Sequence, residues 1–109
     1  MLLQQRRINV NGIRLSLTEN GKEVAHAFLY ILKNDIHKEP FGFLEDVFVH
    51  EAYRGRGNGE RMVKAVIKEA KRQGCYKLVG TCRYARKEVH AFYKKLGFQD
   101  YGKEFRMEL

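Results

Sequence analysis

Alternation of apolar and polar residues predicts a strand pair in the first third of the chain. Residues 13–18 alternate between apolar and polar side chains, which predicts a half-buried strand. Asn20-Gly21 follows and is a strong signal for a two-residue hairpin turn. Residues 24–32 are apolar at nearly every position and predict a second strand, covered on both faces. Residues 8–10 favour a short strand upstream.

In the second half of the chain the hydrophobic pattern alternates between segments typical of strands and segments typical of helices. Phe41 to Val49 predicts a third strand. A helical stripe follows a glycine-rich turn and consists of Met62, Val63, Val66, Ile67 and Ala70. Gly74 predicts the end of this helix. Residues 76–82 predict a strand and residues 87–96 a second helix, which Gly97 ends. Alternation over 105–109 predicts a terminal strand with one wet face.

These elements define a fold class. Their order is β-β-β-α-β-α-β, with an antiparallel N-terminal half followed by a βαβ unit. We therefore expect an α/β (α+β) protein with a mixed sheet and two main helices. A length of 109 residues without linkers or repeats predicts a single domain, residues 1–109.

The charge is uneven along the chain. Residues 1–53 hold six Lys/Arg and seven Asp/Glu, whereas residues 54–109 hold fifteen and six. A basic half is typical of proteins that bind nucleic acid or a polyanionic small ligand, and also of an ordinary solvated surface. Two cysteines provide no disulfide framework and no metal knuckle, so we predict reduced thiols and no metal site. The absence of a signal sequence or an apolar spanning run predicts a cytoplasmic protein without membrane contact.

Two adjacent acids interrupt the third predicted strand. Strict alternation puts Glu45 on one face with Phe43, Val47 and Val49, and Asp46 on the other face with Phe48. An acid within an apolar strand is costly unless it has a partner or meets water. A salt bridge to one of the many arginines and a functional role are equally consistent with this pattern.

The glycine turn after this strand has the features of an anion site. The run Arg54-Gly55-Arg56-Gly57-Asn58-Gly59 precedes the first helix, where unpaired N–H groups and the helix dipole favour negative charge. A P-loop would need a G-x-x-x-x-G-K-[ST] run, which is absent. Glu60 stands where a G-x-G-x-x-G dinucleotide motif needs its third glycine. A phosphate-bearing ligand of another kind is the remaining hypothesis.

The chain resembles the GNAT superfamily of N-acetyltransferases at two separated segments. Residues 54–59 resemble the family's [Q/R]-x-x-G-x-[G/A] signature, and residues 45–49 stand where its fourth strand should precede it. Residues 92–98, F-Y-K-K-L-G-F, resemble the F-Y-x-x-x-G-F segment of its last helix. One helix and one strand lie between the two segments, as in the family. The resemblance covers residues 43–109 well and residues 13–32 loosely.

This resemblance implies acetyl-coenzyme A as the acetyl donor. The backbone N–H groups from about Gly55 to Glu60 would bind its pyrophosphate, which agrees with the anion site inferred above. The exposed backbone around Val47, Phe48 and Val49 would pair with the pantetheine arm. The implied cofactor-binding residues are therefore Val47, Phe48, Val49, Arg54, Gly55, Arg56, Gly57, Asn58, Gly59, Glu60 and Arg86.

The implied reaction is direct attack of a neutral amine on the thioester in a ternary complex. Tyr93 matches the family's tyrosine, which donates a proton to the leaving thiolate. Packing beside Phe92 is the alternative role for Tyr93. Glu45 is our candidate general base, acting through water, and Asp46 is the second choice. Weaker candidates are His50 and His90 as bases and Cys82 as a covalent nucleophile.

Three departures from the family pattern concern the same site. Arg86 stands where many members have an asparagine that bonds the pantetheine arm. Only Asn20-Gly21 separates the first two strands, where the family has helices that help to form the acceptor site. Lys33–Pro40 is the one loop long enough to cover an acceptor. A homodimer would be one way to complete the acceptor site.

Three functional hypotheses follow. The first is an acetyl-coenzyme A-dependent N-acetyltransferase acting on an amine of a small molecule or a protein. The second is a non-catalytic acyl-coenzyme A-binding or regulatory module, which Arg86 and the trimmed acceptor side motivate. The third, a nucleic-acid-binding protein, ranks last because the aromatic residues are not interleaved with basic ones as a stacking face requires.

Overall fold

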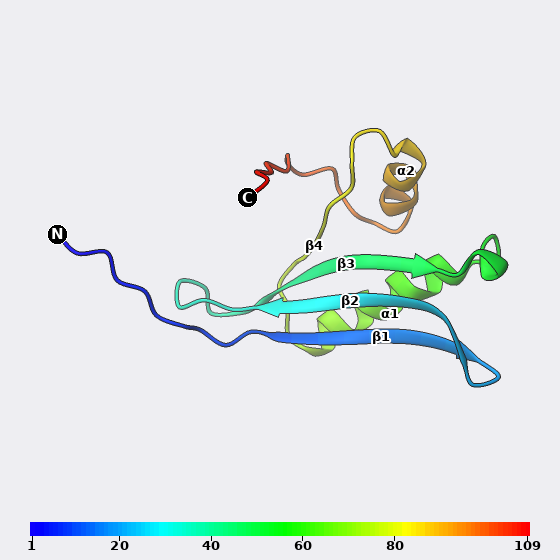
Figure 1. The fold of residues 1–109 in the computed structure, drawn as a ribbon, viewed down its shortest axis with the longest axis horizontal. Helices are drawn as coiled ribbons and strands as arrows, with labels where there is room; N and C mark the ends of the chain where they lie inside the picture. The colour runs from blue at the N-terminus through cyan, green and yellow to red at the C-terminus, as the bar shows by residue number, and fades with distance from the viewer. The chain divides into compact units, whose positions relative to one another are not determined.

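The computed structural model describes residues 1–109, which divide into two compact units. Unit 1 is Met1–Val79 and unit 2 is Gly80–Leu109. Unit 1 holds the sheet and the first helix, and unit 2 holds the second helix (Figure 1). The assignment of residues 1–109 to one domain stays a prediction.

The order of elements confirms the α/β (α+β) class with a mixed sheet and two main helices. The sheet has the strand order β1-β2-β3-β4, and both β1–β2 and β2–β3 are antiparallel. The elements are β1 (Asn11–Glu19), β2 (Lys22–Leu32), β3 (Phe41–Val49), a 3-10 helix η1 (Glu51–Tyr53), α1 (Asn58–Arg72), β4 (Leu78–Gly80) and α2 (Lys87–Lys95).

The β1–β2 hairpin turns at the predicted position. Glu19 pairs with Lys22, and the two residues between them have φ values of 52° at Asn20 and 77° at Gly21. Positive φ at both central positions matches the twist of the flanking strands, and Asn-Gly adopts it at low cost. Local sequence chemistry therefore sets the register beside the turn, and an irregularity between Leu17 and Thr18 shifts it by one residue along the rest of the pair.

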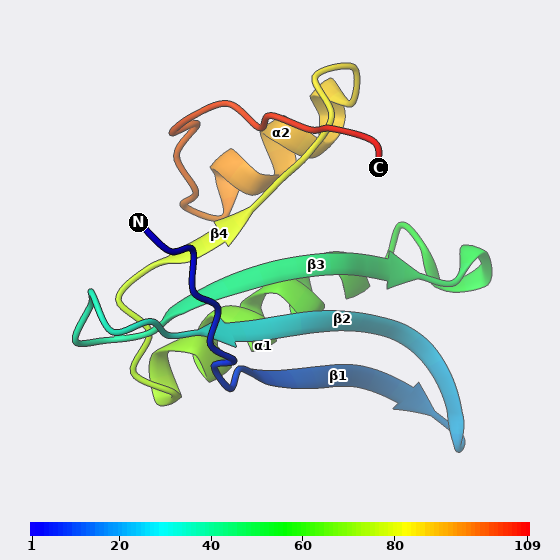
Figure 2. The same cartoon turned by 60° about the vertical axis from the view of Figure 1, so that its left-hand side comes forward.

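The core of unit 1 lies between the sheet and α1. Both views show α1 running behind the β1–β2–β3 sheet, on one of its faces (Figures 1 and 2). The buried apolar residues of α1 are Met62, Val63, Val66 and Ala70, and those of β2 are Val24, Ala25, Ala27, Leu29 and Ile31. The predicted helical stripe is therefore the face of α1 that packs on the sheet.

The β3–α1–β4 segment forms the predicted βαβ unit. The amide of Tyr76 donates to the carbonyl oxygen of Pro40 at 3.0 Å, and the amide of Gly42 donates to that of Lys77 at 2.9 Å. Both chains advance in the same direction through these bonds, so β3 and β4 are parallel. β4 (Leu78–Gly80) is shorter than the strand predicted over residues 76–82.

A β-bulge in β3 corrects the predicted faces of its acids. The register passes from Phe28–Glu45 to His26–Phe48, so two residues of β3 stand opposite one residue of β2. Directly opposed residues share a face, and His26 and Phe28 lie on the same face of β2. Glu45 and Phe48 therefore lie on one face, where strict alternation wrongly separated them.

The prediction that residues 24–32 are covered on both faces is also wrong for unit 1. Burial alternates along β2, with Ala25, Ala27 and Leu29 fully buried beneath α1. His26, Phe28 and Tyr30 on the other face are only half-buried, and they contact one another's rings. Because this open face carries aromatic residues in place of charged ones, the sequence of β2 lacks the apolar–polar alternation that would have indicated one open face.

The predicted strands at the two ends of the chain do not form. Residues 1–10 and 98–109 carry no regular secondary structure, and Phe105, Met107 and Leu109 are 90%, 80% and 115% exposed. Alternation creates a strand only when a neighbour supplies ladder hydrogen bonds. Unit 2 holds no strand beyond the last residue of β4, so its C-terminal segment has no such neighbour within the unit.

Candidate functional site

A tight turn carries the backbone from the end of β3 into α1. Glu51–Tyr53 form η1, and Gly55 and Gly57 follow with φ values of 74° and 79°. Gly57 is the N-cap of α1. A Cβ at Gly55 or Gly57 would meet nothing within 4 Å, so the positive φ and not crowding accounts for glycine here.

Six consecutive backbone N–H groups at this turn have no acceptor within the protein. They belong to residues 55–60, and the first helical hydrogen bond of α1 runs from the amide of Arg61 to the carbonyl of Gly57 at 3.0 Å. Free N–H groups together with the positive end of the helix dipole favour an anion. The residues present therefore fit the pyrophosphate of the implied coenzyme A.

Three side chains hold the turn in place. The Nδ2 group of the buried Asn58 donates to the carbonyl oxygen of Tyr53 at 3.0 Å. The Nε group of Arg54 donates to the carbonyl oxygen of Val49 at 2.8 Å, and its guanidinium lies 5.5 Å from the Phe48 ring centroid. Arg56 lies 5.6 Å from the ring of Tyr53. The side chain of Asn58 therefore braces the turn, and its backbone N–H is the group available to a ligand.

The end of β3 carries the predicted acids and the strand segment assigned to the pantetheine arm. Glu45 and Asp46 are both exposed, and neither makes an ion pair. Asp46 has a φ of 51°, a left-handed value that Asp tolerates better than most residues. The bulge leaves Asp46 and Val47 outside the regular pairing with β2, whereas Val49 pairs with Ala25.

A shallow groove of about 370 Å³ lies on the open face of the sheet beside this bulge. Its walls come from β2 and β3, and the lining residues are His26, Phe28, Asp46, Val47 and Phe48. The imidazole of His26 stacks on Phe48 with centroids 5.5 Å apart and meets the ring of Phe28 edge-on at 5.7 Å. Phe48 is one of the residues that the sequence assigned to the cofactor.

A charged network flanks this groove on β1 and β2. The Nη2 atom of Arg14 donates to the Oε2 atom of Glu23 at 2.9 Å, and the Nδ1 atom of His26 lies 3.4 Å from that same carboxylate oxygen. Hydrogen bonding from Arg14 is the main reason that the pKa of Glu23 falls to about 2, and His26 lowers it further. Glu23 therefore holds both Arg14 and His26 in place on the open face.

In unit 2, Tyr93 lies at the C-terminal end of α2. The amide of Phe98 donates to the carbonyl oxygen of Tyr93 at 3.1 Å, and the amide of Gly97 donates to that of Lys94 at 3.0 Å. These two bonds, with Gly97 at a φ of 99°, form a Schellman cap. The rings of Tyr93 and Phe98 meet at 5.2 Å. The spacing of Tyr93, Gly97 and Phe98 is thus that of a helix cap.

The surroundings of Tyr93 raise the pKa of its phenol above the ordinary value of 10. Burial is the main cause, and the charge of a Cys82 thiolate adds to it, while the charge of Arg86 acts in the opposite direction. The phenol therefore stays protonated at neutral pH and can donate a proton. Arg86, which stands where many members have an asparagine, is close enough to Tyr93 to act on its titration. Its role toward the cofactor stays a prediction.

The other candidates in unit 2 have structural partners. The Nε2 atom of His90 lies 2.8 Å from the carbonyl oxygen of Arg83, which also accepts from the amide of Arg86 at 3.1 Å. The thiol of Cys82 lies 3.6 Å from that same oxygen. These contacts fix the loop before α2, and none of them activates Cys82 as a nucleophile.

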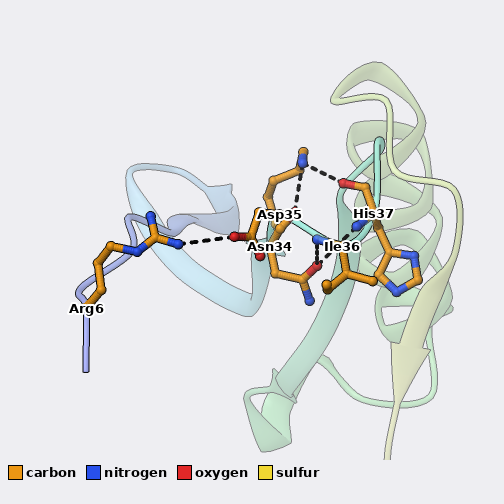
Figure 3. Close-up of polar contacts among 6 residues, drawn as sticks. Arg6, Asn34, Asp35, Ile36 and His37 are labelled. Atoms are coloured by element: carbon orange, nitrogen blue, oxygen red, sulfur yellow. Dashed lines mark hydrogen bonds and ion pairs between the residues drawn. The ribbon is translucent and has the colours of Figure 1, made fainter. Parts of the chain in front are cut away.

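The loop between β2 and β3 is held by its own side chains (Figure 3). The Oδ1 atom of Asn34 accepts from the amides of Ile36 and His37 at 2.9 Å and 3.2 Å. Arg6 forms an ion pair with Asp35 at 3.1 Å, which joins the N-terminal segment to the loop. Lys33–Pro40 is therefore a braced loop, and its role over an acceptor stays a prediction.

Sequence reasoning missed His26 and Phe28 as groove residues because they read as ordinary members of an apolar strand. The aromatic residues at every second position, 26, 28 and 30, were the available signal.

No group of three or more His, Cys, Asp and Glu residues could hold a metal ion. Neither helix is long and apolar enough to cross a membrane.

Comparisons with known proteins agree with these features. The model of the acetyltransferase (GNAT) family matches residues 3–98, which include both the glycine turn and the Tyr93 segment. Among curated proteins, glucosamine 6-phosphate N-acetyltransferase 1 from Oryza sativa subsp. japonica is 46% identical over 57 residues. That match covers 52% of this chain and 33% of the rice protein, so the chain matches only about a third of that relative's length.

Solved structures share the fold. Glucosamine-6-phosphate N-acetyltransferase from Arabidopsis thaliana superposes with a TM-score of 0.79 at 26% sequence identity. The match covers 89% of this chain and 66% of the Arabidopsis chain. An acetyltransferase from Trypanosoma brucei superposes with a TM-score of 0.77 at 27% sequence identity. This match covers 92% of this chain and 69% of the trypanosome chain. The likeness extends over most of the chain.

Proposed function

The chain belongs to the acetyltransferase (GNAT) family, and we propose on that premise that it is an N-acetyltransferase that uses acetyl-coenzyme A. In this proposal an amine acceptor attacks the thioester directly, in a ternary complex of both substrates. Bound acetyl-coenzyme A supplies an activated acetyl group. The residues of this chain bind the donor, orient it, and hold or accept protons.

The observation that carries this proposal is the row of six free N–H groups over residues 55–60. A pyrophosphate offers several acceptor oxygens and negative charge to such a row. Gly55 and Gly57 have the positive φ that the turn requires, and Asn58 braces it from inside. Arg54 and Arg56 add positive charge at the same turn.

The strand before the turn has the second proposed role. The backbone of Val47, Phe48 and Val49 orients the pantetheine arm by strand-like pairing, as the family resemblance implies. The shortness of β4 (Leu78–Gly80) supports this role, because the backbone bonds that join its segment to β3 lie at Pro40 and Gly42, at the opposite end of β3 from Val47. The carbonyl oxygen of Val49 already accepts from Arg54, so one lone pair remains there.

Proton transfer is assigned to two residues. Glu45, exposed on the open face, accepts the proton of the amine through a water molecule. Tyr93 donates a proton to the leaving thiolate, and its raised pKa keeps the phenol protonated for this step. The raised pKa also makes Tyr93 a weaker acid than free tyrosine, so we expect a modest rate contribution from it.

The acceptor is an amine, and the name of the rice relative makes glucosamine 6-phosphate the first compound to test. We propose a cytoplasmic protein whose acceptor side is completed by a second copy in a homodimer. The support is that no helix separates β1 from β2, so the open face of the sheet has no helix of unit 1 on it.

Calorimetry and a turnover assay test the proposed function together. We expect coenzyme A to bind the full chain and acetyl transfer to occur to at least one member of an amine panel that starts with glucosamine 6-phosphate. Binding without transfer to any amine would favour a non-catalytic acyl-coenzyme A-binding module. Absence of coenzyme A binding would overturn the proposal.

A further inference from the structure

We propose that the groove between β2 and β3 binds a protonated amine, with Asp46 as its carboxylate partner and the rings of His26, Phe28 and Phe48 as its walls. This inference rests on the proposed function, because an acceptor amine in water arrives as an ammonium ion. It adds the site at which the ammonium ion is bound and the class of head group that is selected.

The walls of the groove have the chemistry that favours a cation. Aromatic ring faces carry negative charge density, which attracts ammonium and guanidinium groups. The chain already uses these rings in this way, since Arg14 lies 5.6 Å from the centroid of Phe28 and Arg54 lies 5.5 Å from that of Phe48. The ring of His26 contacts those of both Phe28 and Phe48, with centroid distances of 5.7 Å and 5.5 Å, so the three rings form one continuous wall.

The charges around the groove are arranged for a positive ligand. Arg14 is satisfied by Glu23 through two hydrogen bonds, and Arg54 is held by the carbonyl oxygen of Val49. Asp46 and Glu45 have no ion-pair partner although the chain carries a net charge of +8. Arg54 also has no carboxylate partner, so one unpaired guanidinium and two unpaired carboxylates lie near the rings, and the sum of these three charges is negative.

Asp46 lies at the bulge and lines the same groove as Phe48, its second neighbour. The bulge adds Glu45 to the face that carries Phe28 and Phe48, so a second carboxylate lies on the same face of the sheet. A volume of about 370 Å³ suits a small polar molecule or the head group of a larger one. The shape and the charge therefore both fit an alkylammonium group.

The test uses choline, whose quaternary nitrogen cannot be acetylated, so that binding is measured apart from catalysis. Its matched control ligand is the neutral isostere in which carbon replaces the nitrogen. We expect choline to cause saturable shifts in the amide NMR signals of residues 46–48 and of His26 in the full chain. We expect the isostere to bind at least about fivefold more weakly, which is the size of one cation–aromatic contact with a nearby carboxylate.

Two variants assign the effect to the groove. Asp46→Asn removes the charge and keeps a residue that tolerates positive φ, so the bulge should survive. Phe28→Leu keeps apolar bulk and removes a ring. We expect each to weaken choline binding by about fivefold or more, whereas Glu19→Gln, an equal charge change at the exposed end of β1, should leave it unchanged.

Several outcomes would overturn the groove proposal. These are equal binding of choline and its isostere, unchanged choline binding in Asp46→Asn, no saturable shifts, or binding of inorganic phosphate by the same residues. Coenzyme A titrated into the same samples separates the two proposals. If coenzyme A binds and choline does not, the groove proposal fails and the proposed function stands. If choline binds and coenzyme A does not, the groove stands as a cation site and the proposed function fails.

Discussion

The side-chain amide of Asn58 donates to the carbonyl oxygen of Tyr53 at 3.0 Å, across the turn that leads into α1. Asn58 is buried, so this bond is shielded from water and joins η1 to the first residue of the helix. The row of free N–H groups over residues 55–60 begins within the loop that this bond closes and continues into the first turn of α1. The same residue therefore supplies a brace with its side chain and a donor with its backbone.

Replacement of Asn58 by Ala should weaken coenzyme A binding. The substitution removes a buried hydrogen bond worth about 1 kcal/mol, which corresponds to roughly a fivefold loss of affinity if the turn loosens. Asn34→Ala is the matched control, because Asn34 also closes a loop by hydrogen bonds but lies between β2 and β3. Calorimetric titration with coenzyme A checks this, and equal affinities for the two variants would contradict it.

Tyr93→Phe should slow acetyl transfer about tenfold and leave coenzyme A affinity unchanged. Phenylalanine keeps the ring contacts with Phe92 and Phe98 and the backbone of the Schellman cap, so only the hydroxyl is lost. The control is Tyr101→Phe, since Tyr101 is 92% exposed. Steady-state rates and calorimetry provide the comparison, and an unchanged rate would leave Tyr93 with a packing role alone.

Glu45→Gln should lower the turnover number about tenfold to a hundredfold, because the proposed proton acceptor is lost while its size is kept. Coenzyme A affinity should stay at the wild-type value. Glu39→Gln makes the same charge change in the loop before β3 and should leave both quantities unaltered. A fully active Glu45→Gln enzyme would exclude Glu45 as the base and leave Asp46 as the next candidate.

Two carboxylates should make the stability of unit 1 depend on pH. The pKa values of Glu23 and Glu69 fall from the ordinary value of 4.5 to about 2, chiefly through hydrogen bonds from Arg14 and Arg72. A carboxyl pKa that is lower in the folded state stabilises the fold above the unfolded pKa, and this contribution is lost as the pH falls toward the folded pKa. We therefore expect the urea midpoint to fall between about pH 5 and about pH 2.

The charge-removing variant Arg14→Met isolates one of these two contributions. It should lower the urea midpoint at neutral pH and flatten its decline in acid, since Glu23 would lose the partner that depresses its pKa. Lys38→Met, in the exposed loop before β3, should keep the wild-type pH profile. A profile for Arg14→Met that parallels the wild type would show that this ion pair does not contribute.

Much of unit 1 followed from local chemistry in the sequence. The Asn20-Gly21 turn, the helical stripe of α1 and its end before Gly74 each depend on residues close in the chain, and all three are confirmed. The glycine turn was found in the same way, because positive φ and free N–H groups are properties of the segment itself.

The remaining features depend on contacts distant in sequence. The bulge at Asp46 arises from the pairing of β3 with β2, and a period of two cannot show an extra residue in one strand. The segment at 105–109 has the alternation of a strand and lacks a partner within unit 2. His26 and Phe28 became groove residues only because α1 covers one face of the sheet and leaves theirs open.

The most direct test of the central claim compares two glycine variants in coenzyme A binding. Gly57 and Gly21 have φ values of 79° and 77°, and a Cβ at either would meet nothing within 4 Å, so Gly57→Glu and Gly21→Glu impose the same backbone strain and the same charge. We predict that Gly57→Glu lowers the affinity at least about a hundredfold by placing a carboxylate at the phosphate site, while Gly21→Glu binds like the wild type. Equal affinities for the two variants would show that the turn before α1 does not bind the coenzyme A phosphates.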